Sequence, residues 1–421
     1  MKTLIKGRIV PVNDALPAEF DGYVSVIDNL IDYVGTERPS GSFDTELDFS
    51  DMVVMPGLVN THTHASMTLL RGVADDLNLQ DWLNKEIFPR EAKMTPDDIY
   101  WGAKLAIAEF LLGGTTCFAD MYFTDRVAHA VTESGIRANI SLGMTIFGGQ
   151  DGLKNGVEFA NKWQNAENGR IHTCLGPHAI YTCPVDFMKD IVKAAKDNSL
   201  GIHMHISETK KENDDCATCN GASPVKVLGD LGAFDVPTIA AHCVCLSDED
   251  MDILKAKNVS PALNIGSNFK LGSGIARIAD MIDKGLNVTI GTDGPASNND
   301  LDMWEEMRWV SMSAKVWGEP LKVPAAQALK LATSNGAKAL GWNNLGSLAK
   351  GNLADLIVVD FSNPRLVPVF SHVSHLVYAV KPSDIKHVMV DGNFAVWDRE
   401  IQTFDVAETI SKVKEIARRL A

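Results

Sequence analysis

The sequence lacks a basic cluster of the kind that binds a nucleic acid or an anionic membrane. Its 39 lysines and arginines are outnumbered by 54 aspartates and glutamates, which gives a formal net charge of -15 at pH 7. Phosphate-rich partners attract proteins that carry a local excess of positive charge. The charge pattern therefore excludes nucleic acid and membrane as the usual partners and leaves a small neutral or cationic substrate.

Long apolar runs are also missing. No stretch approaches the roughly 20 apolar residues that a transmembrane helix needs. The opening segment MKTLIKGRIV alternates like an edge strand and lacks the apolar core of a signal peptide, so we expect a cytoplasmic protein. The 421 residues, 45% of them hydrophobic, suffice for one large globular domain or for a large domain with a small companion.

Paired cysteines are few. The chain has seven cysteines, an odd number that cannot all pair within one chain, and it has no secretion signal. We therefore expect most of the cysteines to be reduced thiols. Cys216 and Cys219 make a CxxC motif, but no second pair at metal-ligand spacing accompanies it. We therefore interpret this segment as a polar loop, in preference to a structural zinc knuckle or a redox pair.

Short β-rich apolar runs alternate with longer segments of helical period from about Pro56 onward. This alternation, without the glycine fingerprint of a dinucleotide-binding fold, predicts an α/β protein with a (β/α)8 TIM-type barrel. Segments 99–114, 186–198 and 247–257 have the apolar spacing of helices. The eight predicted strands cover residues 53–59, 115–121, 137–144, 170–176, 201–207, 238–244, 258–264 and 287–293.

The two ends of the chain have a different pattern. Residues 1–55 consist of short alternating strands and turns, and the same pattern returns after the helices around residues 325–340. We expect residues 1–55 and 352–421 to build one small composite β-domain, a β-sandwich, beside a catalytic barrel of residues 56–351. Two unrelated terminal extensions would leave the apolar faces of these strands without a partner.

Residues that can bind a metal stand at the ends of several predicted strands. His62 and His64 are two residues apart, so their side chains point to the same face of a strand. His205 lies at the end of the fifth predicted strand, and Asp293 ends the eighth. The carboxyl ends of barrel strands carry catalytic groups. Three imidazoles and a carboxylate around one point predict a site for a divalent transition metal with room for water.

Three further residues lie near these strand ends. Glu208, three residues after His205, is placed to take a proton from a metal-bound water and hand it to the substrate. The other interpretation of Glu208 is an ordinary glutamate at a helix N-terminus. His242 either binds the metal or hydrogen-bonds the hydroxide on it. His203 shares the strand face of His205 and either packs in the barrel or contacts the metal site.

Five segments together resemble the amidohydrolase superfamily, and within it the branch of 5′-methylthioadenosine/S-adenosylhomocysteine deaminases and their 5′-deoxyadenosine relatives. The resemblance spans essentially the whole chain. It implies a barrel with a small β-domain and one bound metal ion, zinc or iron. The segments are PGLVNTHTHASMTLLRG, HMHISET, AAHCV, SNFKLGSG and GTDGPASNN.

The resemblance also implies roles for single residues. Glu208 would be the proton shuttle that activates water and protonates ring nitrogen N1, and His242 would orient the hydroxide. Asp293 would help move the second proton to the departing amine. The fourth predicted strand has no lysine that could bridge two metals, which disfavours a binuclear site. The metal ligands would be His62, His64, His205 and Asp293.

Substrate-binding residues follow from the same resemblance. Glu91 matches the carboxylate that receives the ribose hydroxyls, His178 matches a second contact near the ribose, and Glu208 would contact the purine. Trp82 is a candidate wall of the pocket, although a tryptophan on a helix face is more commonly a core residue. Leu142 stands where relatives that accept S-adenosylhomocysteine carry an arginine for the amino-acid carboxylate.

We therefore expect metal-dependent hydrolytic deamination of 5′-modified adenosines to the inosine analogue and ammonia. The substrates would be methylthioadenosine, 5′-deoxyadenosine or adenosine, with S-adenosylhomocysteine less favoured. One alternative is a related amidohydrolase that acts on guanine, cytosine, a pterin or an s-triazine. Another is a non-catalytic metal-binding barrel, against which the presence of Glu208 and all four ligands argues. The partner would be a small-molecule purine nucleoside, and a homo-oligomer is compatible with the sequence.

Overall fold

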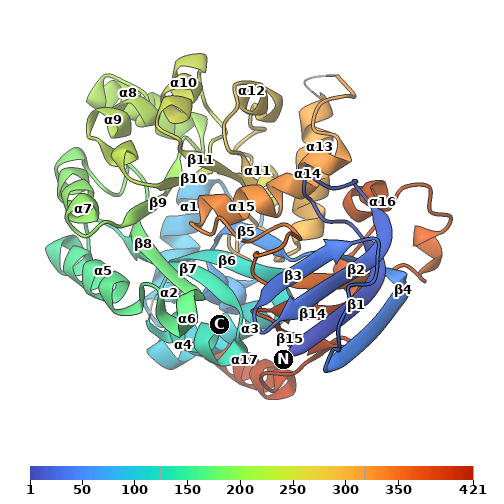
Figure 1. The fold of residues 1–421 in the computed structure, drawn as a ribbon. Helices are drawn as coiled ribbons and strands as arrows, with labels where there is room; N and C mark the ends of the chain where they lie inside the picture. Colours follow the sequence, from blue (N-terminus) through green and yellow to red (C-terminus); the bar gives the residue numbers. More distant parts are fainter. Residues whose placement is uncertain (124, 317–318, 421) are drawn as a thin grey trace.

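The computed structural model describes residues 1–123, 125–316 and 319–420. Eight parallel strands follow one another in chain order around a barrel, and helices cover its outer side (Figure 1). The fold class predicted from the sequence is confirmed. The barrel strands are β5 (Leu58–Thr63), β6 (Thr115–Tyr122), β7 (Arg137–Met144), β8 (Ile171–Pro177), β9 (Gly201–Ile206), β10 (Thr238–His242), β11 (Ser260–Leu263) and β12 (Thr289–Ile290).

The barrel strands are buried along nearly their whole length, because one face points into the barrel and the other meets helices. The helices bury one face only. In α7 the buried residues Phe187, Met188, Ile191, Val192 and Ala195 recur at helical spacing. No helix of the described residues is both long and apolar enough to cross a membrane.

Helices between and after the barrel strands have the following bounds: α1 (Leu79–Asp81), α2 (Phe88–Glu91), α3 (Pro96–Leu112), α4 (Asp125–Ser134), α5 (Gly149–Trp163), α6 (Ala166–Gly169), α7 (Val185–Asp197), α8 (Lys210–Asn220), α9 (Pro224–Asp230), α10 (Asp248–Ala256), α11 (Ile265–Lys270), α12 (Ile278–Asp283), α13 (Met303–Val316), α14 (Ala325–Leu331), α15 (Ser334–Ala339), α16 (His372–Tyr378) and α17 (Val406–Leu420). A π-helical turn, Trp82–Ile87, joins α1 to α2.

The first barrel strand lies further along the chain than the sequence suggests. The apolar run 53–59 was expected to be one strand, but the chain changes sheets within it. Pro56 still pairs with Leu356 of the terminal strand β13 (Leu356–Asp360), whereas Leu58 pairs with Thr115 of the barrel. Gly57 between them permits the crossing, because a Cβ atom there would lie 2.2 Å from Thr116 Oγ1. Residues 53–56 form a strand, as expected, but the expectation that they belong to the barrel was wrong, because they lie in the terminal sheet.

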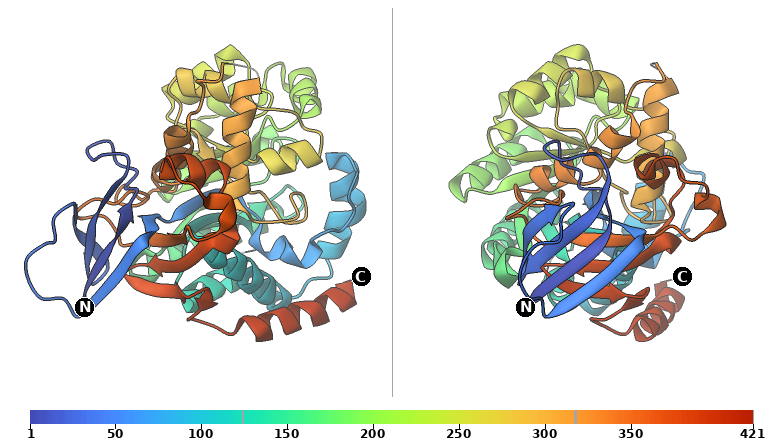
Figure 2. Two further views of the ribbon diagram at one scale, coloured as in Figure 1. Left: turned by 90° about the vertical axis from the view of Figure 1, so that its right-hand side faces the viewer. Right: turned by 45° about the vertical axis from the view of Figure 1, so that its right-hand side comes forward.

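The two chain ends form a second sheet beside the barrel, as expected. Its strands hydrogen-bond in one continuous series, in which β4 pairs with β1 on one side and with β13 on the other. Figure 2 shows the blue N-terminal and red C-terminal strands side by side. The strands are β1 (Lys2–Ile9), β2 (Phe20–Ile27), β3 (Leu30–Gly35), β4 (Thr45–Pro56), β13 (Leu356–Asp360), β14 (Ile385–Val390), β15 (Asn393–Trp397) and β16 (Glu400–Ile401).

The terminal sheet has a core on each face. One face encloses its own apolar cluster, which includes Ile5, Val24 and Leu356. The other face contributes Ile357 and Val388 to the large core that runs through the barrel. Helix α17 leaves the sheet and packs on the barrel helix α3 (Figure 2). Because one core crosses between the two parts, the boundaries at residues 55/56 and 351/352 stay a prediction.

The CxxC segment lies on a helix, which corrects the expectation of a polar loop. The Thr209 side chain caps the N-terminus of α8, and Gly221 in the left-handed conformation ends the helix. The sequence predicts a loop here because α8 is polar on nearly all sides and has almost no apolar residues at helical spacing. All seven cysteines are free thiols, in agreement with the reduced state expected from the sequence.

A buried ion-pair cluster joins the terminal sheet to the barrel. Arg137, the first residue of β7, donates from Nε and Nη2 to the two carboxylate oxygens of Asp355 at 3.1 and 3.0 Å. Its Nη2 also donates to Asp391 Oδ1 at 3.1 Å. The side chains of Arg137 and Asp355 are each 1% exposed, so neither charge can be satisfied by water if its partner is lost.

We predict that Asp355→Ala lowers the free energy of unfolding by about 3–5 kcal/mol, because it leaves a buried guanidinium short of its main partner. Urea unfolding followed by circular dichroism measures the change. Asp186→Ala is the matched control, since Asp186 pairs with Lys189 while 94% exposed, and it should leave the midpoint unchanged. An Asp355→Ala chain that unfolds at the wild-type urea concentration would show that the sheet docks without this pair.

Candidate active site

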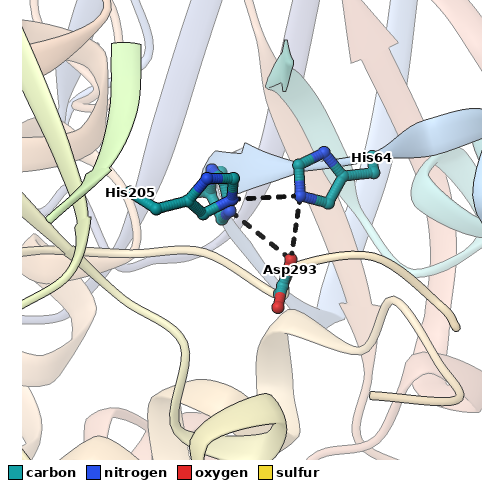
Figure 3. Close-up of side chains that lie close together, drawn as sticks. His64, His205 and Asp293 are labelled. Atoms are coloured by element: carbon teal, nitrogen blue, oxygen red, sulfur yellow. Dashed lines mark hydrogen bonds and ion pairs between the residues drawn. The ribbon is translucent and has the colours of Figure 1, made fainter. Parts of the chain in front are cut away.

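Four side chains predicted to bind a metal converge at the carboxyl ends of the barrel strands. The ligand atoms of His62, His64, His205 and Asp293 all lie within 4.8 Å of one another, and all four residues are buried. Asp293 Oδ1 is 3.4 Å from His62 Nε2 and 3.2 Å from His64 Nε2. Figure 3 shows His64, His205 and Asp293 pointing toward one another. We refer to these four residues as the four-residue cluster.

Hydrogen bonds to backbone carbonyls fix the tautomers of two imidazoles. His64 Nδ1–H donates to the Met121 carbonyl at 2.6 Å, and His205 Nδ1–H donates to the His178 carbonyl at 2.7 Å. In the neutral tautomers that these bonds select, both Nε2 atoms carry lone pairs, and they lie only 3.3 Å apart. Two lone pairs and a carboxylate oxygen at this range repel one another unless they share a cation. The donor set thus fits a divalent metal ion.

His203 holds the third imidazole in place. It is fully buried in the barrel, and its Nε2 lies 2.8 Å from His62 Nδ1. The sequence left open whether His203 packs in the barrel or contacts the metal site. The structure shows both, because His203 is buried inside the barrel and contacts His62 of the four-residue cluster. A partner of this kind fixes the ring orientation of a histidine whose other nitrogen binds a metal.

Burial and neighbouring charges keep three members of the cluster, His62, His205 and Asp293, in the forms that a metal requires. Burial lowers the pKa of His62 to about 3 and that of His205 well below its usual range. Burial alone would raise the pKa of Asp293, but His62 and His64 hold it well below its usual value. At neutral pH His62 and His205 are therefore neutral and the Asp293 carboxylate is ionised.

Strained backbone marks the same edge of the barrel. Ser207, His242 and Asp293 have φ angles of 52°, 73° and 60°, in the left-handed region that side chains with a Cβ atom seldom adopt. Gly291, in the segment GTDG, leaves the space that the neighbouring strand needs, since a Cβ atom there would lie 2.8 Å from the His62 backbone nitrogen. The Asp293 N–H donates to the His62 carbonyl at 3.0 Å and so closes the barrel at the cluster.

Glu208 and His242 face each other beside the cluster. Glu208 Oε2 lies 3.9 Å from His242 Nε2, and His242 Nδ1 hydrogen-bonds Asn268 Oδ1 at 2.8 Å. Burial raises the pKa of the Glu208 carboxyl, as expected for a group that exchanges protons near neutral pH. His242 stands outside the four-residue cluster, so the geometry favours a hydrogen-bonding role over metal binding for it.

A cavity of about 390 Å³ opens beside the cluster, and every other residue predicted to bind substrate lines it. Glu91 and His178 line it, and Trp82 does so from the π-helical turn while its ring also joins a buried apolar cluster. The His178 Nδ1 lies 2.9 Å from Thr182 Oγ1. The structure therefore brings all these residues together, although their roles stay predictions.

Tyr122 is a pocket residue that the sequence analysis missed. It is the last residue of β6, and its hydroxyl donates to Glu91 Oε1 at 2.5 Å. The predicted strand ended one residue earlier, at Met121, and the rule that barrel strands display functional groups at their ends would have found Tyr122 had the strand been extended by one residue.

The lining of the cavity is apolar and acidic. Glu91, Glu208 and Asp293 supply negative charge, and no lysine or arginine is among the described residues that line the cavity. Leu142 lies on the wall, where the resemblance would place an arginine. Lys154, which follows in the chain, is 71% exposed on α5 and pairs with Glu158 instead.

The model of the amidohydrolase family matches residues 53–395 of the chain. The chain belongs to the amidohydrolase family. Among its relatives, the 5-methylthioadenosine/S-adenosylhomocysteine deaminase of Dictyoglomus thermophilum is 46% identical over 396 residues, which cover 93% of each chain. The protein of the same name from Thermoanaerobacter pseudethanolicus is 42% identical over 428 residues, with 100% of this chain and 99% of that one covered.

Solved structures of other proteins resemble this amidohydrolase over nearly its whole length. An adenosine deaminase from Xanthomonas campestris with bound zinc has a TM-score of 0.94 at 32% identity, covering 99% of this chain and 98% of that chain. An atrazine chlorohydrolase from Arthrobacter aurescens in complex with zinc has a TM-score of 0.89 at 22% identity, covering 99% of this chain and 100% of that one. The second likeness shows the fold alone.

We predict that the purified amidohydrolase carries about one divalent ion per chain and that His64→Ala removes most of it, because the variant loses one donor of the set. Inductively coupled plasma mass spectrometry of both proteins measures the content. His129→Ala, a change on the exposed side of α4, is the control and should keep the wild-type content. Full metal content in His64→Ala would place the ion elsewhere.

Proposed function

We propose that this amidohydrolase is a metal-dependent deaminase that converts 5′-modified adenosines and water to the inosine analogue and ammonia. The observation that carries the proposal is a single cavity lined by three members of the four-residue cluster (His64, His205 and Asp293), by the Glu208–His242 pair and by the Glu91–Tyr122 pair. The names of the relatives at 42–46% identity and the likeness to a zinc-bound adenosine deaminase support the same chemistry.

The four-residue cluster would hold one zinc or iron(II) ion. Its neutral imidazole nitrogens and ionised carboxylate are suited to either metal. When bound, the ion supplies a Lewis acid that makes water an effective nucleophile at neutral pH. β8 carries no lysine, the residue that a carbamate bridge between two ions would need, so we propose a single ion.

Glu208 moves the first proton in the proposed reaction. Its carboxylate takes a proton from the water that attacks C6 and gives it to N1 of the purine, so that C6 becomes tetrahedral. His242, held by Asn268 on the far side of the ring, directs its Nε2 toward Glu208 and orients the attacking water. The ionised Asp293 takes the second proton from the hydroxyl group on C6 and passes it to the amino group. The C6–N bond then breaks, ammonia leaves, and the C6 oxygen becomes the carbonyl of the inosine analogue.

Glu91 would bind the two ribose hydroxyls at the other end of the cavity. Its Oε1 accepts the Tyr122 hydroxyl, which fixes the direction of the carboxylate. His178 and Trp82 would flank the sugar and the base. A ribose site favours nucleosides over free guanine, cytosine, pterins or s-triazines, none of which carries a sugar.

The 5′-substituent should be small or apolar. The cavity lining offers Leu142 and Phe147 but, among its described residues, no cation that could pair with the carboxylate of S-adenosylhomocysteine. Burying a charged carboxylate without a partner is costly. Methylthioadenosine, 5′-deoxyadenosine and adenosine therefore fit the cavity better than the homocysteine derivative.

We predict that Glu208→Gln lowers kcat for 5′-methylthioadenosine by about 10²–10⁴-fold and keeps the metal content, because only the proton acceptor is lost. The change in ultraviolet absorbance and the release of ammonia measure turnover. Glu158→Gln is the matched control on the surface of α5 and should keep the wild-type rate. A near-native rate for Glu208→Gln would refute the role of Glu208 as the shuttle.

A panel of adenosines with different 5′-groups tests the substrate assignment. We expect kcat/KM for methylthioadenosine to exceed that for S-adenosylhomocysteine by at least about tenfold, since an unpaired buried charge costs more than 1.4 kcal/mol. Leu142→Arg should narrow this ratio by raising the value for S-adenosylhomocysteine. Equal values in the wild type, or a ratio that Leu142→Arg leaves unchanged, would contradict the assignment.

A further inference from the structure

A second buried carboxylate lies behind the turn that carries Glu208. Glu212 is the third residue of α8, and it is 5% exposed. A glutamate at this position commonly accepts a hydrogen bond from the backbone N–H of the N-cap residue. In α8 the N-cap is Thr209, whose side chain accepts the N–H of Glu212, but the Glu212 carboxylate reaches further back along the chain.

Both oxygens of Glu212 bind the backbone next to the proposed proton shuttle. Oε1 accepts the Ser207 N–H at 3.1 Å, and Oε2 accepts the Glu208 N–H at 2.8 Å. From the other side, the Cys245 N–H donates to the Ser207 carbonyl at 2.9 Å. Ser207 is one of the strained residues with a left-handed φ angle, so the turn keeps its shape only while these bonds hold it.

Two other helices of the barrel show what ordinary capping looks like. In α3, Asp98 accepts the N–H of its N-cap residue Thr95, and in α10, Asp250 does the same for Ser247. The acidic residue at the third position of α8 departs from this arrangement, although Thr209 already caps the helix. Capping the helix therefore does not explain the two bonds of Glu212.

Keeping this carboxylate buried is unfavourable. Burial, and after it the nearby carboxylate of Glu208, raise the pKa of Glu212 to about 7. Ionisable groups with such perturbed environments concentrate at functional sites. The group stands away from the cavity, since the residues that line the cavity include Glu208 but not Glu212. It can therefore act on the reaction only through the turn.

We propose that Glu212 is a positioning residue for the proton shuttle. Its two hydrogen bonds fix the Ser207–Glu208 turn and thereby hold the Glu208 carboxylate in the cavity, 3.9 Å from His242. The inference rests on the proposed role of Glu208. A shift of about 1 Å in a catalytic group can lower a rate by about 10²-fold, so a hydrogen-bonded anchor of this kind affects the rate without touching the substrate.

Glu212→Gln tests the proposal, because it keeps the size of the side chain and replaces one acceptor with a donor. We expect kcat for methylthioadenosine to fall by about 10–100-fold, with KM and metal content near wild type, because Glu91 and the four-residue cluster are untouched. Glu212→Asp, which shortens the reach, should have the same effect and provides a second variant if Glu212→Gln does not fold. Asp250→Asn is the matched control, which should lower stability at the start of α10 and leave kcat unchanged.

Crystal structures of the wild type and of Glu212→Gln provide a readout that needs no turnover. We expect the Glu208 carboxylate of the variant to leave its place beside His242. A Glu208 that keeps this place overturns the proposal whatever the rate, and so does a variant with wild-type kcat. If the wild type deaminates none of the adenosines, the proposed function fails, and the position of Glu208 in the two structures still decides the role of Glu212.

Discussion

The site depends on ligand atoms that the fold holds at short range from one another. His64 and His205 each give their Nδ1–H to a backbone carbonyl, so their Nε2 lone pairs meet at 3.3 Å in front of the Asp293 carboxylate. This arrangement is repulsive by itself and becomes favourable around a cation. One carbonyl belongs to Met121 in β6, the neighbour of β5, and the other to His178 directly after β8, the neighbour of β9. The sheet itself thus sets the direction of each imidazole.

The same edge of the barrel also contains the strain. Ser207, His242 and Asp293 adopt left-handed backbone conformations that cost about 1–3 kcal/mol each. Such conformations persist because buried hydrogen bonds hold them, as Glu212 does for Ser207 and as the His62 carbonyl does for Asp293. The rigid strands and the large core below them can bear this cost. A loop without that support would relax and separate the side chains.

Much of the fold and of the four-residue cluster could be predicted from the sequence, since strand period and position at strand ends are local signals. The features that the sequence analysis missed are those that tertiary contacts determine. The run 53–59 reads as one strand, because nothing in its composition shows that the chain changes sheets at Gly57. Tyr122 resembles a core aromatic, and Glu212 lies in the polar segment KKENDD, where a solvated glutamate is the normal expectation. Their partners, Glu91 and the turn at Ser207, come together only in the folded chain.

Four carboxyl groups, three that line the cavity and one behind it, take different roles because their surroundings differ. Two imidazoles keep Asp293 ionised, as a metal ligand requires, whereas burial raises the pKa of Glu208 toward the range useful for proton transfer. Burial likewise raises the pKa of Glu91, which the Tyr122 hydroxyl opposes by donating to its oxygen. Glu212 binds only backbone N–H groups. A single acidic pocket can therefore contain a ligand, a proton shuttle and a sugar contact, with an anchor behind it, and each side chain is assigned by the groups that face it.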